Sequence, residues 1–462
     1  MVKRKIMTLF VTTMMTLAFV ACSSTQVIES TGETKETGTK EETTEKVPIT
    51  ITFRDDGGTV LSDWFIAAYE TWELKDQAEI KLAPITAAEG DYFAKVALSL
   101  QSESTAPDIV CEDTFQLASD VAAGYLTDLS AYLVNYDDWN NGIYSGALVE
   151  GLTYDDGAVY TIPYCTDTRG LWYNKEIFIQ AGIEVPWQPK TWDDILEVCA
   201  IIQSECPDVI PFWCNSGVAT GEATSMQTYE MLLYGTGEEL LDNDDKWIVS
   251  SDNILSSLEF IDAIYTNGYG PSLSQVLNGE ASNTSAREYM PNGKLAISLD
   301  GFWITGNYKE AGPSPWPEYE DILGFALMPT MEGQEPGTIT MSGGWGLSIP
   351  ELSDEKELAF DFIKHCMEHD NYIGYIVASG NIATKMDATM DSAYTEQAFM
   401  EEATSALEGA YYRPRNSQYT TVTTYIQSMV ESVASGTSPV EAMSQYEINV
   451  GNAVGSDNVV SK

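Results

Sequence analysis

Basic residues are scarce in this chain of 462 residues. It has 23 Lys and Arg against 70 Asp and Glu, which gives a formal net charge of -47. A field of that sign repels the phosphates of nucleic acids and of anionic lipid headgroups. No basic patch interleaved with aromatic residues offsets it. We therefore expect neither nucleic acid nor a bare membrane surface as a partner.

Several motifs of catalytic and cofactor chemistry are also missing. Neither a G-x-G-x-x-G loop after a strand nor a G-x-x-x-x-G-K-[ST] loop occurs, which argues against nucleotide binding. No G-x-S-x-G turn is present, and the two histidines of the chain are too few to favour a Ser–His–Asp site. We expect no cofactor and no catalytic residue.

The two histidines form one motif that resembles a metal site. His365 to His369, "HCMEH", matches the H-x-x-E-H spacing of one class of zinc metalloproteases. The helical periodicity places both imidazoles on the shoulder of a helix whose apolar face includes Phe362 and Cys366. No third ligand stands out downstream. We therefore interpret the pair as surface residues of a packed helix and predict no metal.

Cysteines are few, and none are spaced as C-x-x-C, which excludes zinc-ribbon and thioredoxin-type sites. Cys206 and Cys214 lie close enough in sequence to form a local disulfide in an exported protein. The alternative is that most of the cysteines are small buried hydrophobic residues. Beyond Cys22 they are Cys111, Cys165, Cys199, Cys206, Cys214 and Cys366.

Only the N-terminus carries a sustained apolar run, and its length of ~15 residues is short of the ~20 that span a bilayer. A basic start, the run Ile6 to Val20, and a small residue before Cys22 resemble a bacterial lipoprotein signal. Phe19 departs from the leucine usual at its position. We predict a signal peptide over 1–21, lipid (palmitate) attachment at Cys22 on the extracytoplasmic face of the cell membrane, and a disordered polar tether over 22–46.

Strand-like and helix-like segments alternate from Val47 onward. This pattern predicts an α/β fold with mostly parallel strands, and the length predicts two lobes. A capping box of Thr191 and Asp194 marks one helix start. Other helices are expected over Leu61 to Trp72, Asp91 to Gln101, Glu355 to about Met367 and Tyr419 to Ser435.

Polar groups follow several apolar segments at their ends. Arg54, Asp55 and Asp56 follow one predicted strand, and Asp113 follows another. Ligands of α/β sheets bind in the crevice beyond the carboxyl ends of strands. Carboxylates and guanidinium groups suit paired hydroxyls, and aromatic faces suit the apolar face of a sugar ring. Each of these residues could alternatively be structural.

The stretch "TIPYCTDTRGLWYNKEIF" places Asp167 and Arg169 within an otherwise apolar and aromatic run. Residues two apart in an extended chain point to the same side. Both side chains therefore point the same way. They either face a ligand cleft or form an ion pair inside the protein. Trp303 and Trp345, each beside glycines, could complete an aromatic cleft.

The segments "YTIPYCTDTRGLWYNKEIFIQAGIEVPWQPKTWDDILEV", "NGKLAISLDGFWI" and "SGGWGLSIP" resemble carbohydrate-binding lipoproteins of ABC importers, the maltose-binding-protein-like extracellular solute-binding family. The resemblance covers the chain from about Ile49. It implies a two-lobed, type II periplasmic-binding-protein-like fold whose hinge the chain crosses more than once. The expected lobes are 47–163 with about 345–392, and 164–344 with about 393–462.

The resemblance also implies a function. Asp167 matches a residue that binds sugar hydroxyls, Trp303 a stacking tryptophan, and Asp113 an acid of the opposite lobe. The expected protein is a monomer that captures a sugar or oligosaccharide and delivers it to an ABC permease. Alternatives are a polyamine, a peptide or another small solute as ligand, or a secreted glycoside-active enzyme. The predicted ligand-binding residues are Asp55, Asp56, Asp113, Asp167, Arg169, Trp303, Gly344, Trp345 and Tyr412.

Overall fold

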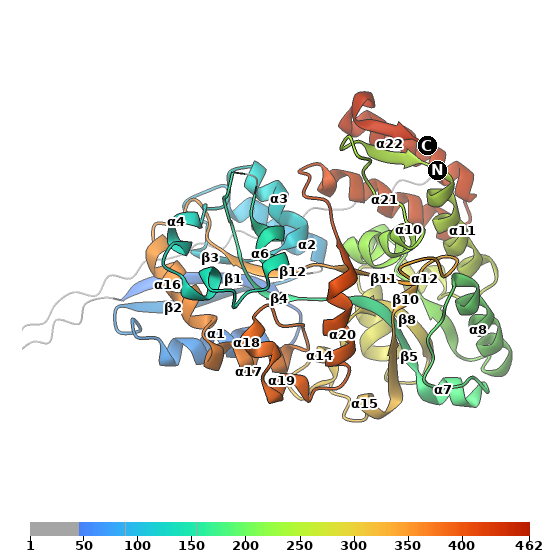
Figure 1. Ribbon diagram of the computed structural model, residues 1–462, viewed down its shortest axis with the longest axis horizontal. Helices are drawn as coiled ribbons and strands as arrows, with labels where there is room; N and C mark the ends of the chain where they lie inside the picture. Colours follow the sequence, from blue (N-terminus) through green and yellow to red (C-terminus); the bar gives the residue numbers. More distant parts are fainter. Residues whose placement is uncertain (1–45, 88, 155) are drawn as a thin grey trace, which may run out of the picture. The chain divides into compact units, whose positions relative to one another are not determined.

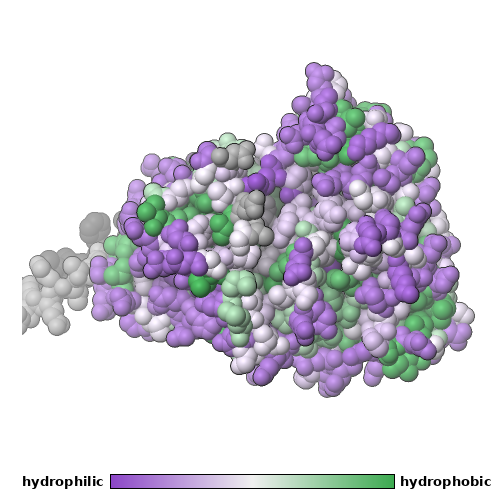
Figure 2. Space-filling view, in the orientation of Figure 1, coloured by the Kyte–Doolittle hydropathy of each residue, from purple (hydrophilic) through white to green (hydrophobic). Residues whose placement is uncertain are grey.

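The computed structural model describes residues 46–462 except positions 88 and 155 (Figure 1). The predicted signal peptide, Cys22 and all but the last residue of the predicted tether lie outside the described residues. Within the described part of the chain, we find no helix with the length and apolar character needed to cross a bilayer. Hydrophilic residues dominate the face shown in Figure 2, where hydrophobic ones form small separate groups.

A five-stranded sheet forms the centre of the N-terminal lobe, with the strand order β2-β1-β3-β12-β4. The strands are β1 Val47–Asp55, β2 Ala78–Thr86, β3 Ile109–Asp113, β4 Ile162–Thr166 and β12 Gly344–Ser348. The helices of this lobe are α1 Val60–Thr71, α2 Glu89–Ser99, α3 Thr114–Ala122, α4 Ser130–Leu133, α5 Asp137–Asn140, α6 Gly146–Leu152, α16 Lys356–Cys366 and α17 His369–Ser379. Helix α1 packs against α16 and α17, and its Trp64 stacks on Tyr375 with ring centroids 4.3 Å apart.

A four-stranded sheet of order β6-β8-β5-β9 forms the centre of the C-terminal lobe. Its strands are β5 Arg169–Asn174, β6 Ile210–Trp213, β8 Leu295–Gly301 and β9 Leu323–Ala326. The longer helices are α7 Lys175–Gln180, α8 Trp192–Glu205, α11 Asp252–Thr266, α21 Tyr419–Ala434 and α22 Pro439–Val454. The shorter ones are α9 Glu222–Thr224, α10 Met231–Gly235, α12 Leu273–Val276, α13 Ala281–Thr284, α14 Ile304–Tyr308 and α15 Tyr319–Ile322, with π-helical turns η2 Ser225–Glu230 and η3 Ser285–Tyr289. Strand β7 Trp247–Ser250 pairs with β14 Val459–Ser461.

The α/β class is confirmed, but the sheets are mixed rather than mostly parallel. In the N-terminal lobe, β1 is parallel to β2 and β3, whereas β12 is antiparallel to β3 and β4. In the C-terminal lobe, β6 and β8 are parallel, whereas β5 is antiparallel to β8 and β9. The antiparallel strands are those next to the crossings between lobes. A chain that enters a sheet from the other lobe is not bound by the helical crossover that keeps sequential strands parallel.

The chain passes between the two sheets twice in short extended segments. Strand β4 ends at Thr166 in one sheet and β5 begins at Arg169 in the other. Strand β11 Thr338–Ser342 pairs with β10 Met328–Pro329 and β13 Ala410–Tyr412, and β12 begins two residues later. The segment that leads back to β13 contains α18 Met386–Thr389, α19 Ser392–Thr395 and α20 Met400–Ala406. The residue limits predicted for the lobes stay a prediction.

Most of the predicted helix positions are confirmed. Helices α1, α2, α16 and α21 lie within one or two residues of the expected spans. Thr191 caps α8, and its capping box with Asp194 is present. Ile195, Val198 and Ile202 form the buried face of that helix.

The interpretation of the histidine pair needs one correction. His365 lies in α16, which ends at Cys366, but His369 begins α17, because Glu368 leaves the helical conformation with a ψ of 141°. His365 Nδ1 lies 3.0 Å from Glu368, and His369 lies 3.2 Å from Asp391. Among the described residues, no group of three or more Cys, His, Asp or Glu side chains could hold a metal ion.

The cysteines follow the second of the two interpretations. All six described cysteines, Cys206 and Cys214 included, are free and buried. Burial raises the pKa of the Cys111 thiol to about 12 and that of Cys214 to about 12 as well. Thiols with such pKa values are protonated at neutral pH and act as small apolar side chains.

Candidate functional site

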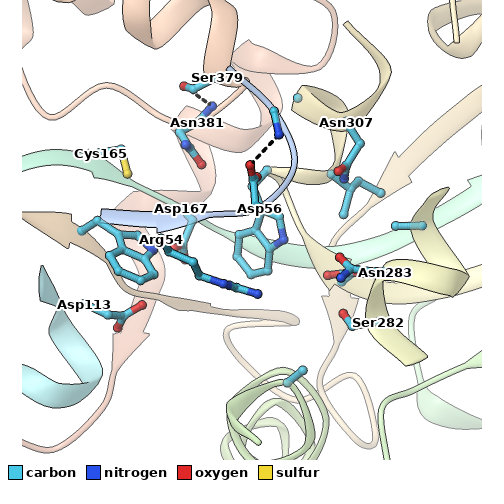
Figure 3. A pocket seen from close by; sticks show the side chains of 18 of the residues that line it. Arg54, Asp56, Asp113, Cys165, Asp167, Ser282, Asn283, Asn307, Ser379 and Asn381 are labelled. Atoms are coloured by element: carbon cyan, nitrogen blue, oxygen red, sulfur yellow. Dashed lines mark hydrogen bonds between the residues drawn. The ribbon is translucent and has the colours of Figure 1, made fainter. Parts of the chain in front are cut away.

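A cavity of about 270 Å³ lies between the two lobes, beyond the carboxyl ends of β1 and β3. Its N-terminal-lobe side includes Arg54, Asp56 and Asp113. Its opposite side includes Ser282 and Asn283, which come from helix α13 of the C-terminal lobe. Figure 3 shows these five side chains around the cavity. The position agrees with the crevice expected beyond the strand ends.

Asp113 is fixed by local structure on one side and by an ion pair on the other. It is the last residue of β3 and caps α3, because its Oδ1 accepts a hydrogen bond of 2.7 Å from the Phe115 N–H. The same oxygen lies 3.2 Å from Nη2 of Arg413. The Asp113 carboxylate therefore lines the cavity in one fixed orientation.

Asp167 and Arg169 form an ion pair and also line the cavity. Both are buried, with 7% and 4% of their surfaces exposed. Asp167 Oδ1 accepts a 3.1 Å hydrogen bond from the Gly343 N–H, and Arg169 Nη1 donates to the Met341 carbonyl at 3.1 Å. The pair therefore links the first crossing to the second. The internal ion pair is therefore present and also borders the cavity, whereas ligand binding by the two residues stays a prediction.

The two predicted tryptophans line the cavity and are supported by aromatic and cationic neighbours. The Arg169 guanidinium lies over the Trp303 ring, 4.9 Å from its centroid. The Trp303 ring folds back on Gly301, where a Cβ atom would lie 2.0 Å from the ring. Trp345 stacks on Phe93 with centroids 6.0 Å apart and planes 23° apart. Aromatic rings held in this way offer flat apolar surfaces to a ligand.

A second contact between the lobes lies on the side of the cavity formed by Asp56. Arg287 Nη1 donates a 2.9 Å hydrogen bond to the Asp56 carbonyl, and its Nη2 lies 4.0 Å from the Asp56 carboxylate. Arg287 Nε also donates to Asn307 Oδ1 at 2.8 Å. Asp56 and Arg287 therefore pair across the cavity in the way that Asp113 and Arg413 do.

Three of the predicted ligand-binding residues do not line the cavity. Asp55 accepts hydrogen bonds from the Thr86 hydroxyl at 2.7 Å and the Gly57 N–H at 2.9 Å, which lower the pKa of its carboxyl. Gly344 has a φ of +137°, and a Cβ there would lie 2.2 Å from the Cys165 carbonyl oxygen. Tyr412 ends β13 and is 51% exposed. Their surroundings support local or backbone roles.

Several residues of the cavity carry no signal in the sequence. Arg413 is the most notable, because it contacts acids of both lobes: Asp113 at 3.2 Å and Glu222 at 3.4 Å. Burial alone lowers the pKa of its guanidinium, but the two acids outweigh burial and raise it. The other unpredicted polar residues of the lining are Thr220, Glu222, Gln227, Ser282, Asn283, Arg287, Asp300, Asn307, Ser379 and Asn381.

The charges of the lining nearly cancel, in contrast to those of the whole chain. Five carboxylate residues line the cavity, namely Asp56, Asp113, Asp167, Glu222 and Asp300. Four arginines line it, namely Arg54, Arg169, Arg287 and Arg413. The formal charge of the lining is therefore 4 − 5 = −1, whereas the chain carries -47. Arg169, Arg287 and Arg413 each contact at least one of these carboxylates within 4.0 Å.

Residues 58–372 match the family model of the bacterial extracellular solute-binding proteins, and the chain belongs to that family. It is therefore a substrate-binding protein of an ABC transporter, as the sequence motifs indicated. Proteins of this family bind a solute without transforming it, so the expectation of a non-enzyme agrees with the family.

Individual relatives agree with this assignment. The diacetylchitobiose-binding protein DasA of Streptomyces coelicolor is 23% identical over 395 residues, which cover 84% of this chain and 86% of DasA. A solute-binding protein from Thermotoga lettingae, solved with α-D-tagatose, has a TM-score of 0.77 at 24% identity and covers 89% of this chain and 100% of its own. Maltose-bound MalE3 of T. maritima has a TM-score of 0.72 at 22% identity, over 87% of this chain and 98% of its own. At these identities the solved structures show the fold, which confirms the type II two-lobed class.

Proposed function

We propose that this protein captures a neutral sugar or a short oligosaccharide between its lobes and delivers it to the membrane subunits of an ABC transporter. It does so from the outer face of the cell membrane, to which a lipid on Cys22 attaches it. The observation that carries the proposal is the lining of the cavity, which combines two tryptophans with carboxylates, amides and arginines.

The paired charges favour a ligand without net charge. Each of Asp56, Asp113 and Asp167 already has a guanidinium neighbour, at 4.0 Å or less. A pair of this kind offers fixed acceptors on the carboxylate and fixed donors on the guanidinium, which together match the hydroxyl groups of a sugar. Hydroxyls can bind both without leaving a buried charge unpaired.

The size of the cavity favours a small ligand. Its volume of about 270 Å³ is near the lower end of the ~300–1,000 Å³ usual for small-molecule sites. Trp303 and Trp345 both border this space. We therefore expect one or two sugar rings inside the cavity, with any further rings outside it.

Polyamine binding is the second candidate, and the net charge of -47 is what favours it. A polyamine needs several carboxylates that have no cation of their own. The lining has a formal charge of only −1, because four arginines lie among its acids. The contacts within the cavity therefore favour the sugar.

A thermal-shift screen tests the proposal on residues 46–462. Maltose, maltotriose, α-D-tagatose, diacetylchitobiose and arabino-oligosaccharides are compared with spermidine. At about 100 times its Kd, a true ligand adds about 2.7 kcal/mol of stability. Trp303→Leu should abolish the shift, and Trp187→Leu, which changes a tryptophan that packs on Phe178, should keep it. A shift with spermidine and none with any sugar would replace the proposal by the second candidate.

A further inference from the structure

Two buried carboxyl groups of the C-terminal lobe share one hydroxyl group. Tyr419 Oη lies 3.0 Å from Glu222 Oε2 and 2.6 Å from Glu230 Oε1. A phenol has a single O–H and can donate it to only one of these oxygens. An ionised carboxylate has no hydrogen to donate, so the second contact requires that one carboxyl group holds a proton. The geometry therefore places one proton on this pair.

The surroundings of the two carboxyl groups show which of them holds the proton. Glu222 accepts hydrogen bonds from Ser225 at 2.8 Å and from Thr423, and it lies 3.4 Å from Arg413. Glu230 is fully buried, and among the described residues its Oε2 has no hydrogen-bond partner. Ionisation is supported at Glu222 and unsupported at Glu230. Burial, with a further contribution from Glu222, raises the pKa of Glu230 to about 8.

Other ionisable groups around Glu230 do not reverse this assignment. The hydrogen bond with Tyr419 and the charges of Arg413 and Arg169 lower the pKa of Glu230, yet burial and Glu222 outweigh them and the net direction is upward. Burial, with a further contribution from Glu230, raises the pKa of Tyr229, Tyr234 and Tyr446, which remain neutral. Strand β8, which packs on the same turn, carries Asp300, and β11 carries no ionisable residue.

The proton-holding pair is connected to the opposite lobe by Arg413. With the proton on Glu230, its O–H donates to the Tyr419 oxygen, which leaves the Tyr419 O–H to donate to Glu222. Arg413 lies between Glu222 and Asp113. Asp113 belongs to the N-terminal lobe, whereas the other members belong to the C-terminal lobe or to the segment that follows β13. The contacts therefore run from the interior of one lobe to a strand end of the other.

We propose that Glu230 is a positioning residue whose proton couples the closure of the lobes to pH. When the lobes separate, Arg413 loses Asp113, and water reaches Glu222 and Arg413 at the cavity wall. Water stabilises a second ionised carboxyl group, so the open form holds the proton less tightly than the closed form does. Closure then takes up a proton and weakens as pH rises. The inference rests on the proposed function in assuming that the lobes close around a ligand.

Energy transfer between dyes on the two lobes tests this coupling without any ligand. Leu98 and Ile448 are exposed, at 66% and 56%, and lie on α2 and α22. Both are changed to cysteine in residues 46–462, where the six native cysteines are buried and react slowly. We expect the ratio of closed to open molecules to fall about tenfold for each pH unit over which only the closed form holds the proton.

Three variants distinguish this coupling from a general effect of alkaline pH. Glu230→Gln keeps the shape of the protonated form and should hold the ratio constant from pH 6 to pH 9.5. Tyr419→Phe removes the shared hydroxyl and should move the midpoint of the transition. Glu112→Gln removes another buried acid with a raised pKa, in the N-terminal lobe, and should retain the wild-type response.

Two results would overturn the inference: a wild-type ratio that does not change with pH, or a Glu230→Gln protein that responds like the wild type. Because no ligand is present, failure to bind any sugar would leave this test unaffected. Conversely, sugar binding with a pH-independent lobe distance would leave the proposed function standing and remove the coupling.

Discussion

Replacing Asp167 by Asn should destabilise the empty protein, because Asp167 is paired with Arg169 in a buried position. The side chains are 10% and 5% exposed, and the carboxylate also accepts the Gly343 N–H. Removing one partner of a buried ion pair leaves the other charge uncompensated and costs about 3–5 kcal/mol. We expect Asp167→Asn to lower the free energy of unfolding by about 3 kcal/mol, near the lower limit, because the amide oxygen can still accept one hydrogen bond.

A double-mutant cycle measures this pairing directly. Urea unfolding of residues 46–462 is compared for Asp167→Asn, Arg169→Met and the double variant. The free energy of unfolding should fall in the double variant by at least ~1 kcal/mol less than the sum of its falls in the two single variants, because the double variant buries no unpaired charge. Glu79→Gln is the control, since its pair with Lys81 is 46% and 56% exposed and should contribute less than ~1 kcal/mol. Additive losses across the cycle would show that the two charges do not stabilise each other.

Three further predictions follow from the structure. Burial and the neighbouring Asp120 raise the pKa of Glu112 well above 4.5, so the stability that its proton provides is complete below pH 4.5 and is lost as pH rises through the raised value. The stability of Glu112→Gln relative to the wild type should therefore be higher in urea titrations at pH 8.5 than at pH 5, and a constant difference would contradict the shift. Gly344→Ala places a Cβ 2.2 Å from the Cys165 carbonyl at a positive φ, so it should lower the free energy of unfolding by more than ~1 kcal/mol, whereas Gly374→Ala, with no atom within 4 Å of its Cβ, should not. Cys22→Ala in the full-length chain should abolish labelling by a radioactive fatty acid, and labelling that persists would exclude Cys22 as the attachment site.

The acids at the strand ends could be predicted because their positions depend on local sequence. Asp56 and Asp113 follow apolar runs, and the carboxyl end of a strand in an α/β sheet faces the ligand crevice. The prediction was less precise at the level of single residues. Asp55 turns toward Thr86 while its neighbour Asp56 reaches the cavity, because consecutive residues of an extended chain point in opposite directions.

The arginines that complete the site could not be predicted from local sequence. Arg413 and Asp113 are separated by 300 positions, and only the return of the chain through β13 brings them to 3.2 Å. Tyr412 was predicted instead, one position before the residue that lines the cavity. Glu222 and Glu230 lie on short helical segments with no strand-end signal. Their roles depend on tertiary contacts with Tyr419.

Strand direction also depended on tertiary structure. The alternation of helices and strands indicates parallel pairing when each helix returns the chain to the same sheet. Strand β12 instead arrives from the other lobe and inserts between β3 and β4 in the opposite direction. The apolar pattern of "SGGWGLSIP" is the same for either direction, so it predicts a buried strand without fixing its orientation.

Calorimetric titration of residues 46–462 with the best sugar of the thermal screen, at low and at high salt, tests the central claim most directly. A neutral ligand held by paired charges should bind one to one, with a Kd that changes little between 0.02 and 0.5 M salt as rough working limits. Asp113→Asn should weaken binding by about 10-fold or more, which corresponds to about 1.4 kcal/mol. The absence of binding by every sugar, together with spermidine binding that weakens steeply with salt, would contradict the account.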